Sequence, residues 1–143
     1  MAAPDPLAAI VAYVKADSTV NTLVSGRVYG SELPGTEAFN KSMPAATILF
    51  IGSGGGSLLG ASYLELAEPR IDAFCYGSTP YQAALVSRNL TPLLRQMKRN
   101  VKAGALLHWA HPSGGPISSR EPGTEWPVCW SAYSVLVSEV TIV

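Results

Sequence analysis

The stretch PRIDAFCYGSTPYQAALVSRNLTPLLRQM, residues 69–97, decides the fold class. Up to Gly77, small or aliphatic side chains alternate with charged or aromatic ones, which is the pattern of a strand with two different faces. The next residues, 78–80, combine capping side chains with a proline that suits the first turn of a helix. From Tyr81 to Met97 the apolar residues recur every three or four positions, as they do along an amphipathic helix. The stretch therefore predicts a strand that passes into a long helix with almost no loop.

Residues that share a face recur every second position along the strand and every three or four positions along the helix. One face of the strand carries Ile71, Ala73 and Cys75, and the other carries Asp72, Phe74 and Tyr76. The apolar stripe of the helix consists of Ala83, Val86, Leu90, Leu93, Leu94 and Met97. Pro92 lies inside this stripe, where it removes a backbone donor and clashes one turn back. We therefore expect a kink or a break of the helix near Asn89.

The N-terminal region predicts a helix and a short helical turn. Asp5 can cap a helix whose first turn holds Pro6, and this helix should end near residues 16–17. Ser18 can cap the second turn, which Gly26 closes.

Outside these helices, β-forming runs alternate with runs of glycine and proline. The further predicted strands are residues 45–51, 105–110 and 126–140, and residues 27–29 and 62–67 are expected only as extended pieces. The last is too long for one flat strand, so Pro127 or Ser138 should mark a boundary. Pro69 implies a sheet edge, a bulge or a strand boundary. We expect a connector at 30–43, a flexible hairpin tip at 52–57 and a long Pro/Gly/Ser loop at 111–125.

This order of elements predicts a single α+β domain covering residues 1–143. Strands joined by loops and hairpins, with one helical crossover, favour an antiparallel or mixed sheet. We expect about four strands, with two main helices packed on one face of the sheet.

The composition points to a partly covered surface. The chain has 143 residues, of which 48% are apolar and only 14% are charged, and its formal net charge is zero. Globular domains usually carry about 25% charged residues. A self-associating subunit would cover such a surface, and an ordinary domain with a Gly/Ser/Pro-rich surface is the alternative.

The distribution of basic residues and the lengths of the apolar runs disfavour nucleic acids and membranes as partners. The basic residues cluster only at Arg95, Lys98, Arg99 and Lys102, at the end of the long helix, where cations complement the helix dipole. No apolar run reaches the roughly 18 residues of a membrane span, and the N-terminus lacks the basic start of a signal peptide. We therefore expect a protein of the cytoplasm, with no direct nucleic-acid recognition and no membrane partner.

No pattern in the chain predicts an active site or a cofactor. The glycine run at 52–57 lacks the lysine of a phosphate-binding loop and the third glycine of a dinucleotide motif. His108 and His111 have a metal-like spacing, but no third ligand stands nearby in the sequence. Cys75 and Cys129 both fall inside predicted strands, where a thiol is inert. We expect no catalytic residue and no bound metal.

Aromatic residues supply the remaining candidates for a binding face. Trp109, Trp126, Trp130, Tyr76 and Tyr133 lie on or beside predicted strands, where aromatic residues usually pack in the core. Trp126 differs because it stands where the long loop enters the last strand, a position from which it can anchor an interface.

The order of these elements resembles the tail terminator or tail-completion proteins of long-tailed bacteriophages and of related prophage or gene-transfer particles. Four features carry the resemblance in sequence order: the N-terminal helix with its small turn and residues 27–29, the strand at 44–48, the strand-to-helix junction at 70–84, and the long polar loop before the final Tyr/Val-rich strand. Two features depart from the family pattern, namely Pro92 inside the helix and the glycine run at 52–56.

The resemblance implies a structural virion protein rather than an enzyme. Such a subunit usually assembles as a six-membered ring that caps the finished tail tube. Its expected partners are further copies of itself, the major tail tube protein and the connector or stopper protein between head and tail. The protein would be assembled in the host cytoplasm and end in the tail or neck of the virion.

Candidate interface residues come from the predicted loops: Phe39, Met43, Gly54, Gly55, Gly56, Leu58, Leu59, Arg120, Glu121, Glu125 and Trp126. Two alternatives remain open. One is a neighbouring neck protein, such as a head-completion or stopper protein. The other is a small ligand-binding or metal-dependent enzyme domain that uses the glycine run and the histidine pair.

Overall fold

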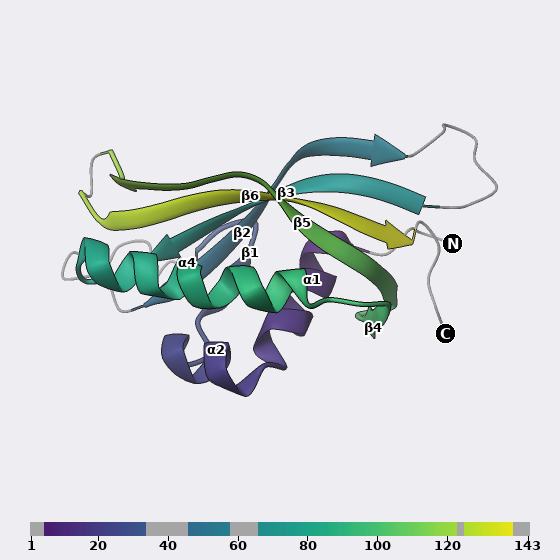
Figure 1. Cartoon of the computed structure of the whole chain (residues 1–143), viewed down its shortest axis with the longest axis horizontal. Helices are drawn as coiled ribbons and strands as arrows, with labels where there is room; N and C mark the ends of the chain where they lie inside the picture. The colour runs from purple at the N-terminus through teal and green to yellow at the C-terminus, as the bar shows by residue number, and fades with distance from the viewer. Residues whose placement is uncertain (1–4, 34–45, 58–65, 123–124, 139–143) are drawn as a thin grey trace.

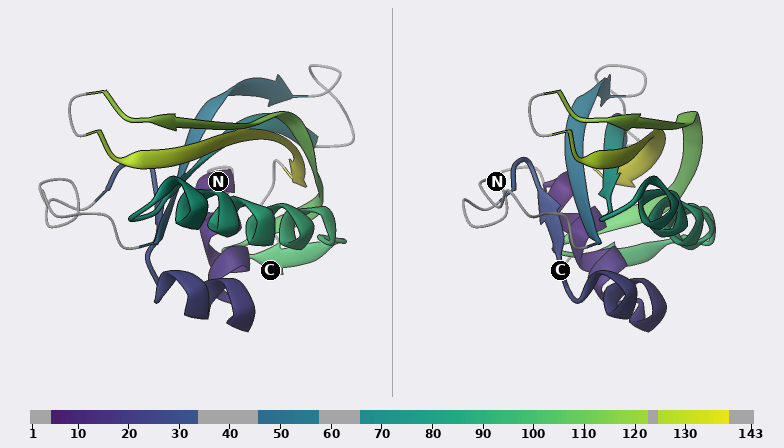
Figure 2. Two further views of the ribbon diagram at one scale, coloured as in Figure 1. Left: turned by 60° about the vertical axis from the view of Figure 1, so that its left-hand side comes forward. Right: turned by 90° about the vertical axis from the view of Figure 1, so that its left-hand side faces the viewer.

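A curled six-stranded sheet with helices on one side is the main feature of the fold (Figures 1 and 2). The computed structural model describes residues 5–33, 46–57, 66–122 and 125–138. The elements of these ranges are α1 Pro6–Lys15, α2 Ser18–Val24, β1 Val28–Gly30, β2 Thr47–Ser57, β3 Leu66–Tyr76, α4 Pro80–Arg95, β4 Asn100–Lys102, β5 Ala105–Arg120 and β6 Pro127–Ser138. The α+β class is confirmed, but the sheet has six strands where about four were expected.

The sheet is mixed, with the strand order β1-β2-β3-β6-β5-β4. Only β1 and β2 are parallel, and the other neighbours are antiparallel. The two additional strands are the short edge strands. β1 was expected only as a brief extended piece, and β4 was not predicted because its three residues show no periodicity.

The glycine run is a strand rather than a hairpin tip. β2 continues through Ser57, and Gly54, Gly55 and Gly56 lie opposite Arg70, Pro69 and Glu68 of β3. The β2–β3 register shifts by one residue between Gly52 and Gly54. Glycine weakens a strand but keeps both backbone hydrogen-bonding groups, so a paired neighbour can hold it extended.

The expected loop at 111–125 is also largely a strand. β5 runs to Arg120 along β6, and its register shifts three times, between Leu107 and Trp109, Pro112 and Gly114, and Gly114 and Ile117. Each shift adds a residue to β5, as in a β-bulge, which bends and twists a strand. Beyond Leu107 no described strand pairs with the outer side of β5. Prolines are tolerated on such an edge strand because the residues whose N–H groups would point away from β6 have no neighbouring strand to donate to.

Both prolines that strain the sequence pattern are accommodated without ending their elements. Pro69 lies within the central strand β3, and its β6 ladder is interrupted between Ala67 and Arg70. Pro69 is neither at a sheet edge nor at a strand boundary, and the β3–β6 register does not shift there, so none of the three expectations for Pro69 is met. Pro92 lies inside α4, which continues unbroken to Arg95, so the expected break near Asn89 is wrong. Because Pro92 sits in the last turns, few hydrogen bonds follow it.

The helix starts agree with the sequence with one exception. Asp5 caps α1 by accepting from the Leu7 N–H, and Thr79 caps α4 by accepting from the Gln82 N–H. The cap of α2 is Asp17 rather than Ser18, because its carboxylate accepts from the Val20 N–H at 2.9 Å.

The main core lies between the helices and the concave side of the sheet. The apolar stripe of α4 packs against the face of β3 that carries Ile71, Ala73 and Cys75, and against alternate residues of β2 and β6. Cys75 and Cys129 lie directly opposite each other on β3 and β6, and both are buried free thiols. Burial raises the pKa of the Cys75 thiol, with a smaller contribution from Cys129. The predicted burial of both cysteines is confirmed.

A second, smaller cluster covers part of the opposite side of the sheet. It consists of Leu49, Tyr76, Trp126 and Val128, with Tyr29, Leu33, Ile51 and Phe74 packed against it. These strand residues alternate with the core residues of β2, β3 and β6. The second face expected for residues 72–76 is thus an apolar surface of its own.

Candidate interaction surface

The predicted interface residues divide into three groups. Phe39, Met43, Leu58 and Leu59 lie outside the described residues. Gly54, Gly55 and Gly56 lie in the outer half of β2. Arg120, Glu121, Glu125 and Trp126 come together where β5 turns into β6. This turn is the only one of the three places where described side chains can be assembled into a site.

Short backbone contacts close the β5–β6 turn. Arg120 pairs with Pro127, and the Glu121 N–H donates to the Trp126 carbonyl at 2.9 Å. The Glu125 N–H donates to the Glu121 carbonyl at 2.8 Å. The Arg120 guanidinium closes the turn from outside by donating through Nη1 to the Glu125 carbonyl at 2.9 Å. These bonds therefore fix the backbone that carries the Glu121 side chain.

Trp126 is buried within its own chain. Only 5% of it is exposed, and its ring meets the ring of Tyr76 edge to face, with centroids 6.0 Å apart. The strand-to-helix junction and the end of the β5–β6 hairpin are also joined by the Gly77 N–H, which donates to the Pro127 carbonyl. Trp126 thus packs against Tyr76 inside its own chain and is almost fully covered. Its expected role as an anchor for a partner remains an untested prediction.

A cavity of about 250 Å³ opens beside this turn, on the side of the sheet away from the helices. Its walls are mainly aromatic and apolar, with an acidic and a basic side chain at the hairpin end: Phe74, Tyr76, Ser119, Arg120, Glu121, Pro122, Val128 and Trp130. Three strands and one turn contribute to it, so a local sequence pattern cannot reveal it.

The polar group inside the cavity is the carboxylate of Glu121. The Tyr76 hydroxyl donates a hydrogen bond to it. Burial raises the pKa of Tyr76, and the negative charge of Glu121 and this hydrogen bond raise it further. The other carboxylate oxygen, Oε2, is buried and has no hydrogen-bond partner among the described residues. The cavity therefore combines aromatic walls with a carboxylate of which one oxygen has no hydrogen-bond partner among the described residues.

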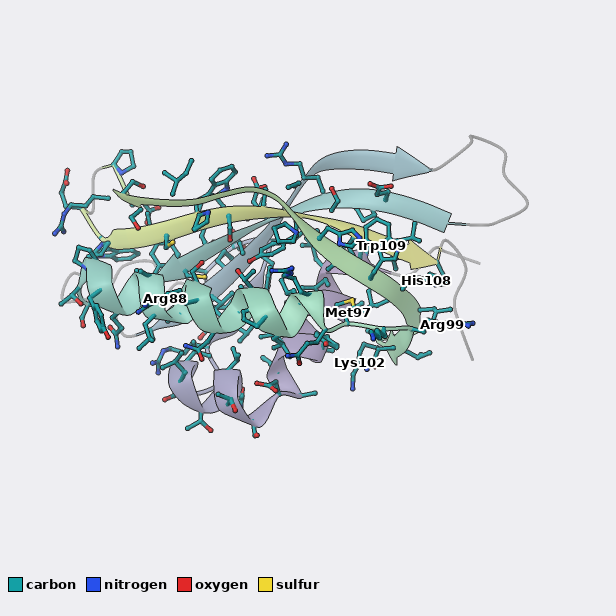
Figure 3. All side chains as sticks on the ribbon, viewed as in Figure 1. Arg88, Met97, Arg99, Lys102, His108 and Trp109 are labelled. Carbon is teal, nitrogen blue, oxygen red and sulfur yellow. The ribbon has the colours of Figure 1, made fainter. Side chains whose placement is uncertain are left out.

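The opposite end of the molecule is basic. Arg95, Lys98 and Arg99 are exposed around the turn from α4 to β4, and Lys102 follows on β4. Figure 3 shows Arg99 and Lys102 at this end, with the Arg99 side chain directed away from the sheet. The Arg99 N–H donates to the His108 carbonyl at 3.2 Å, which ties the turn to β5.

The histidine pair is not arranged as a metal site. His111 stacks on Trp109 with ring centroids 4.2 Å apart, and the β5 register shifts at His108 between Leu107 and Trp109. In the described ranges, no group of three His, Cys, Asp or Glu side chains is placed to hold a metal ion. The glycine run does not form a phosphate loop either, because it lies within a strand instead of leading into a helix.

The helices were also compared with the requirements of a membrane span. Within the described residues, no helix alone is long and apolar enough, and only α1 and α2 taken together pass by length and composition, although they are bent by 93°.

No family model and no curated protein matches the chain. Among solved structures, one chain of the "Virion of native gene transfer agent (GTA) particle" superposes with a TM-score of 0.61. The two chains are 14% identical over 93% of this chain and 94% of that chain.

This chain shares its fold with a protein of a gene transfer agent particle. At that identity the likeness establishes the fold. The likeness extends over nearly the full length of both chains.

Proposed function

We propose that this chain is a structural virion protein, a subunit of a ring that caps a phage-like tail tube and joins it to the neck. The observation that carries the proposal is the shared fold with a chain of a gene transfer agent virion over 93% of this chain. The order of sequence elements supports it independently, because that order resembles tail terminator proteins. A six-membered ring is the proposed form, since the resemblance implies it.

The physical character of the chain supports an assembling role rather than a catalytic one. With 14% charged residues, the surface gains little solubility from charge. The Cys75 thiol is buried with a raised pKa, which disfavours the reactive thiolate. A closed ring multiplies a modest pairwise contact, so a flat or shallow surface is sufficient for function.

The decisive experiment combines light scattering with electron microscopy of the purified protein, alone and mixed with the tail tube protein from the same particle. We expect rings, either free or at one end of the tubes. Binding to the connector side without binding to tubes would favour a head-completion or stopper protein instead. A monomer that ignores tail tubes would contradict the proposal.

The competing enzyme hypothesis has a separate test in the histidine pair. We expect His108→Ala and His111→Ala to assemble like the unmodified protein, because a structural ring needs no metal at this place. A ligand- or metal-dependent rise in the melting temperature that these variants abolish would favour the enzyme hypothesis.

A further inference from the structure

Among the described residues, the cavity beside the β5–β6 turn contains an acceptor that is not satisfied. Glu121 Oε2 is buried there without a hydrogen-bond partner among the described residues. A buried acceptor that carries charge and lacks a partner is unfavourable by more than a neutral one. Tyr76 satisfies only one side of the carboxylate. The missing group must be a donor, and a cation would serve best.

The cation nearest in sequence does not fill this role. Arg120 lines the cavity, but its guanidinium donates to the Glu125 carbonyl. Among the described residues the one ion pair is Arg70 with Asp72, 3.7 Å apart on the neighbouring strand β3. Glu121 therefore has no cationic partner among the described residues.

The cavity has the size and the walls that suit a guanidinium group. Its volume of about 250 Å³ is far larger than a single water molecule requires. The rings of Phe74, Tyr76 and Trp130 form part of its lining. Aromatic faces attract cations, and a planar guanidinium can stack on a ring while it donates to a carboxylate. These properties select an arginine side chain as the occupant.

A suitable arginine lies at the other end of the same chain. Arg99 is exposed, and within the described residues its guanidinium has no hydrogen bond or ion pair. Its backbone φ of 45° and its N–H bond to His108 fix the direction of the turn that carries it. The side chain points outward in Figure 3.

These two features cannot meet within one chain. Tyr76 precedes the start of α4 and Arg99 follows its end, and α4 has 16 residues. At 1.5 Å per residue, the helix alone separates them by roughly 24 Å. Complementary groups at opposite ends of a molecule produce a head-to-tail contact between copies, and such contacts form a ring when the rotation closes.

We propose that the cavity beside Glu121 receives the Arg99 side chain of a second copy of this chain. The same contact repeats from one copy to the next. This inference rests on the proposed function for the closure of the contacts into a ring. The pairing itself requires only that copies associate.

Charge-removing variants of the full-length protein test the pairing in sedimentation velocity. Glu121→Gln and Arg99→Ala are each expected to weaken self-association roughly thirtyfold or more, as for a buried charged partner. Glu32→Gln, which removes an exposed charge elsewhere, and Lys98→Ala, which removes the exposed charge next to Arg99, should have much smaller effects. Glu121→Gln should melt like the unmodified protein, since Tyr76 can donate to the amide oxygen.

Mixing the two variants tests the direction of the contact. The Arg99→Ala copy keeps an intact cavity, and the Glu121→Gln copy keeps an intact arginine. An equimolar mixture should therefore form one-to-one dimers, which neither variant forms alone, and these dimers should not grow further. No dimer in the mixture would overturn the inference.

Other outcomes separate this inference from the proposed function. A Glu121→Gln protein that associates like the unmodified protein overturns the pairing but leaves a tube-capping ring in place. An unmodified protein that stays monomeric at the highest soluble concentration also overturns the pairing. Association through the cavity without any binding to tail tubes would overturn the proposed function alone.

Discussion

Tyr133 connects the sheet to the long helix at the level of single hydrogen bonds. It is 1% exposed, and its hydroxyl lies 2.8 Å from the Thr91 hydroxyl and accepts from the Ser131 hydroxyl at 3.2 Å. Tyr133→Phe leaves both hydroxyl groups without this partner. We expect it to lower the free energy of unfolding by about 1–2 kcal/mol in urea denaturation. Tyr81→Phe is the control because Tyr81 is 70% exposed, and equal losses in both variants would contradict the argument.

Buried phenols should also make the protein sensitive to alkali. Burial raises the pKa of both Tyr76 and Tyr133 above the ordinary value of 10.0. The folded state then holds protons that the unfolded state releases above this value, so the stability is complete below it and falls as the pH rises beyond it.

The measurement is the midpoint of urea unfolding, which is monitored by circular dichroism at pH values from neutral to above 10.0. Tyr76→Phe should reduce the loss at high pH, because one raised phenol is gone. Tyr81→Phe should leave the loss unchanged. If Tyr76→Phe does not alter the pH dependence, Glu121 and the buried phenol are not coupled as described.

At the level of whole elements, the junction between β3 and α4 depends on a glycine. A Cβ atom at Gly77 would lie 2.5 Å from the Ala83 backbone nitrogen and 2.8 Å from Gln82 Cβ. Backbone cannot yield as a flexible side chain can, so Gly77→Ala must shift the start of α4. We expect a loss of about 1–3 kcal/mol in thermal or urea unfolding, as for overpacked sites.

Gly52→Ala is the matched control for this prediction. The nearest atom to a Cβ at Gly52 is Leu7 Cδ1 at 4.0 Å, which is ordinary contact. We expect Gly52→Ala to leave the stability nearly unchanged. If both variants lose the same stability, the steric explanation for Gly77 is wrong.

The junction also shows why some elements could be predicted from the sequence and others could not. The β3 faces, the α4 cap and the α4 stripe depend on side chains within a few residues, so their periodicity was sufficient. The glycine run and residues 111–120 became strands because β3 and β6 supply hydrogen-bonding partners from elsewhere in the chain. Composition alone describes such segments as loops.

The candidate site was predictable in part for the same reason. Arg120, Glu121 and Trp126 were singled out because they belong to the end of the expected long loop before the final strand. The cavity was missed because Phe74, Ser119 and Trp130 reach it from three different strands. The alternation at 72–76 indicated a second face, but nothing in the sequence placed Glu121 beside Tyr76.

At the scale of the whole molecule, the long helix sets the distance between two unlike ends. One end carries the aromatic cavity with Glu121, and the other carries the exposed cations around Arg99. The formal net charge is zero, so copies do not repel one another through their overall charge. Unlike ends on a neutral subunit favour a directional contact over a symmetric pair.

Chemical crosslinking can reveal this direction and the number of subunits together. Ser119→Cys places a thiol at the rim of the cavity, and Lys98→Cys places one beside Arg99. The native thiols of Cys75 and Cys129 are 0% and 2% exposed, so they should not react in the folded protein. A short bismaleimide should therefore link only the two introduced cysteines.

We expect the double variant to give a ladder of crosslinked species on a denaturing gel, ending at one closed form. Six subunits are expected from the proposed ring. Each single variant should stay uncrosslinked. A head-to-tail contact brings position 119 of one copy close to position 98 of the next, and does not bring two identical positions together. A ladder from a single variant would indicate a symmetric contact instead, and a ladder without an end would indicate an open filament. Either result would contradict a ring closed through Glu121 and Arg99.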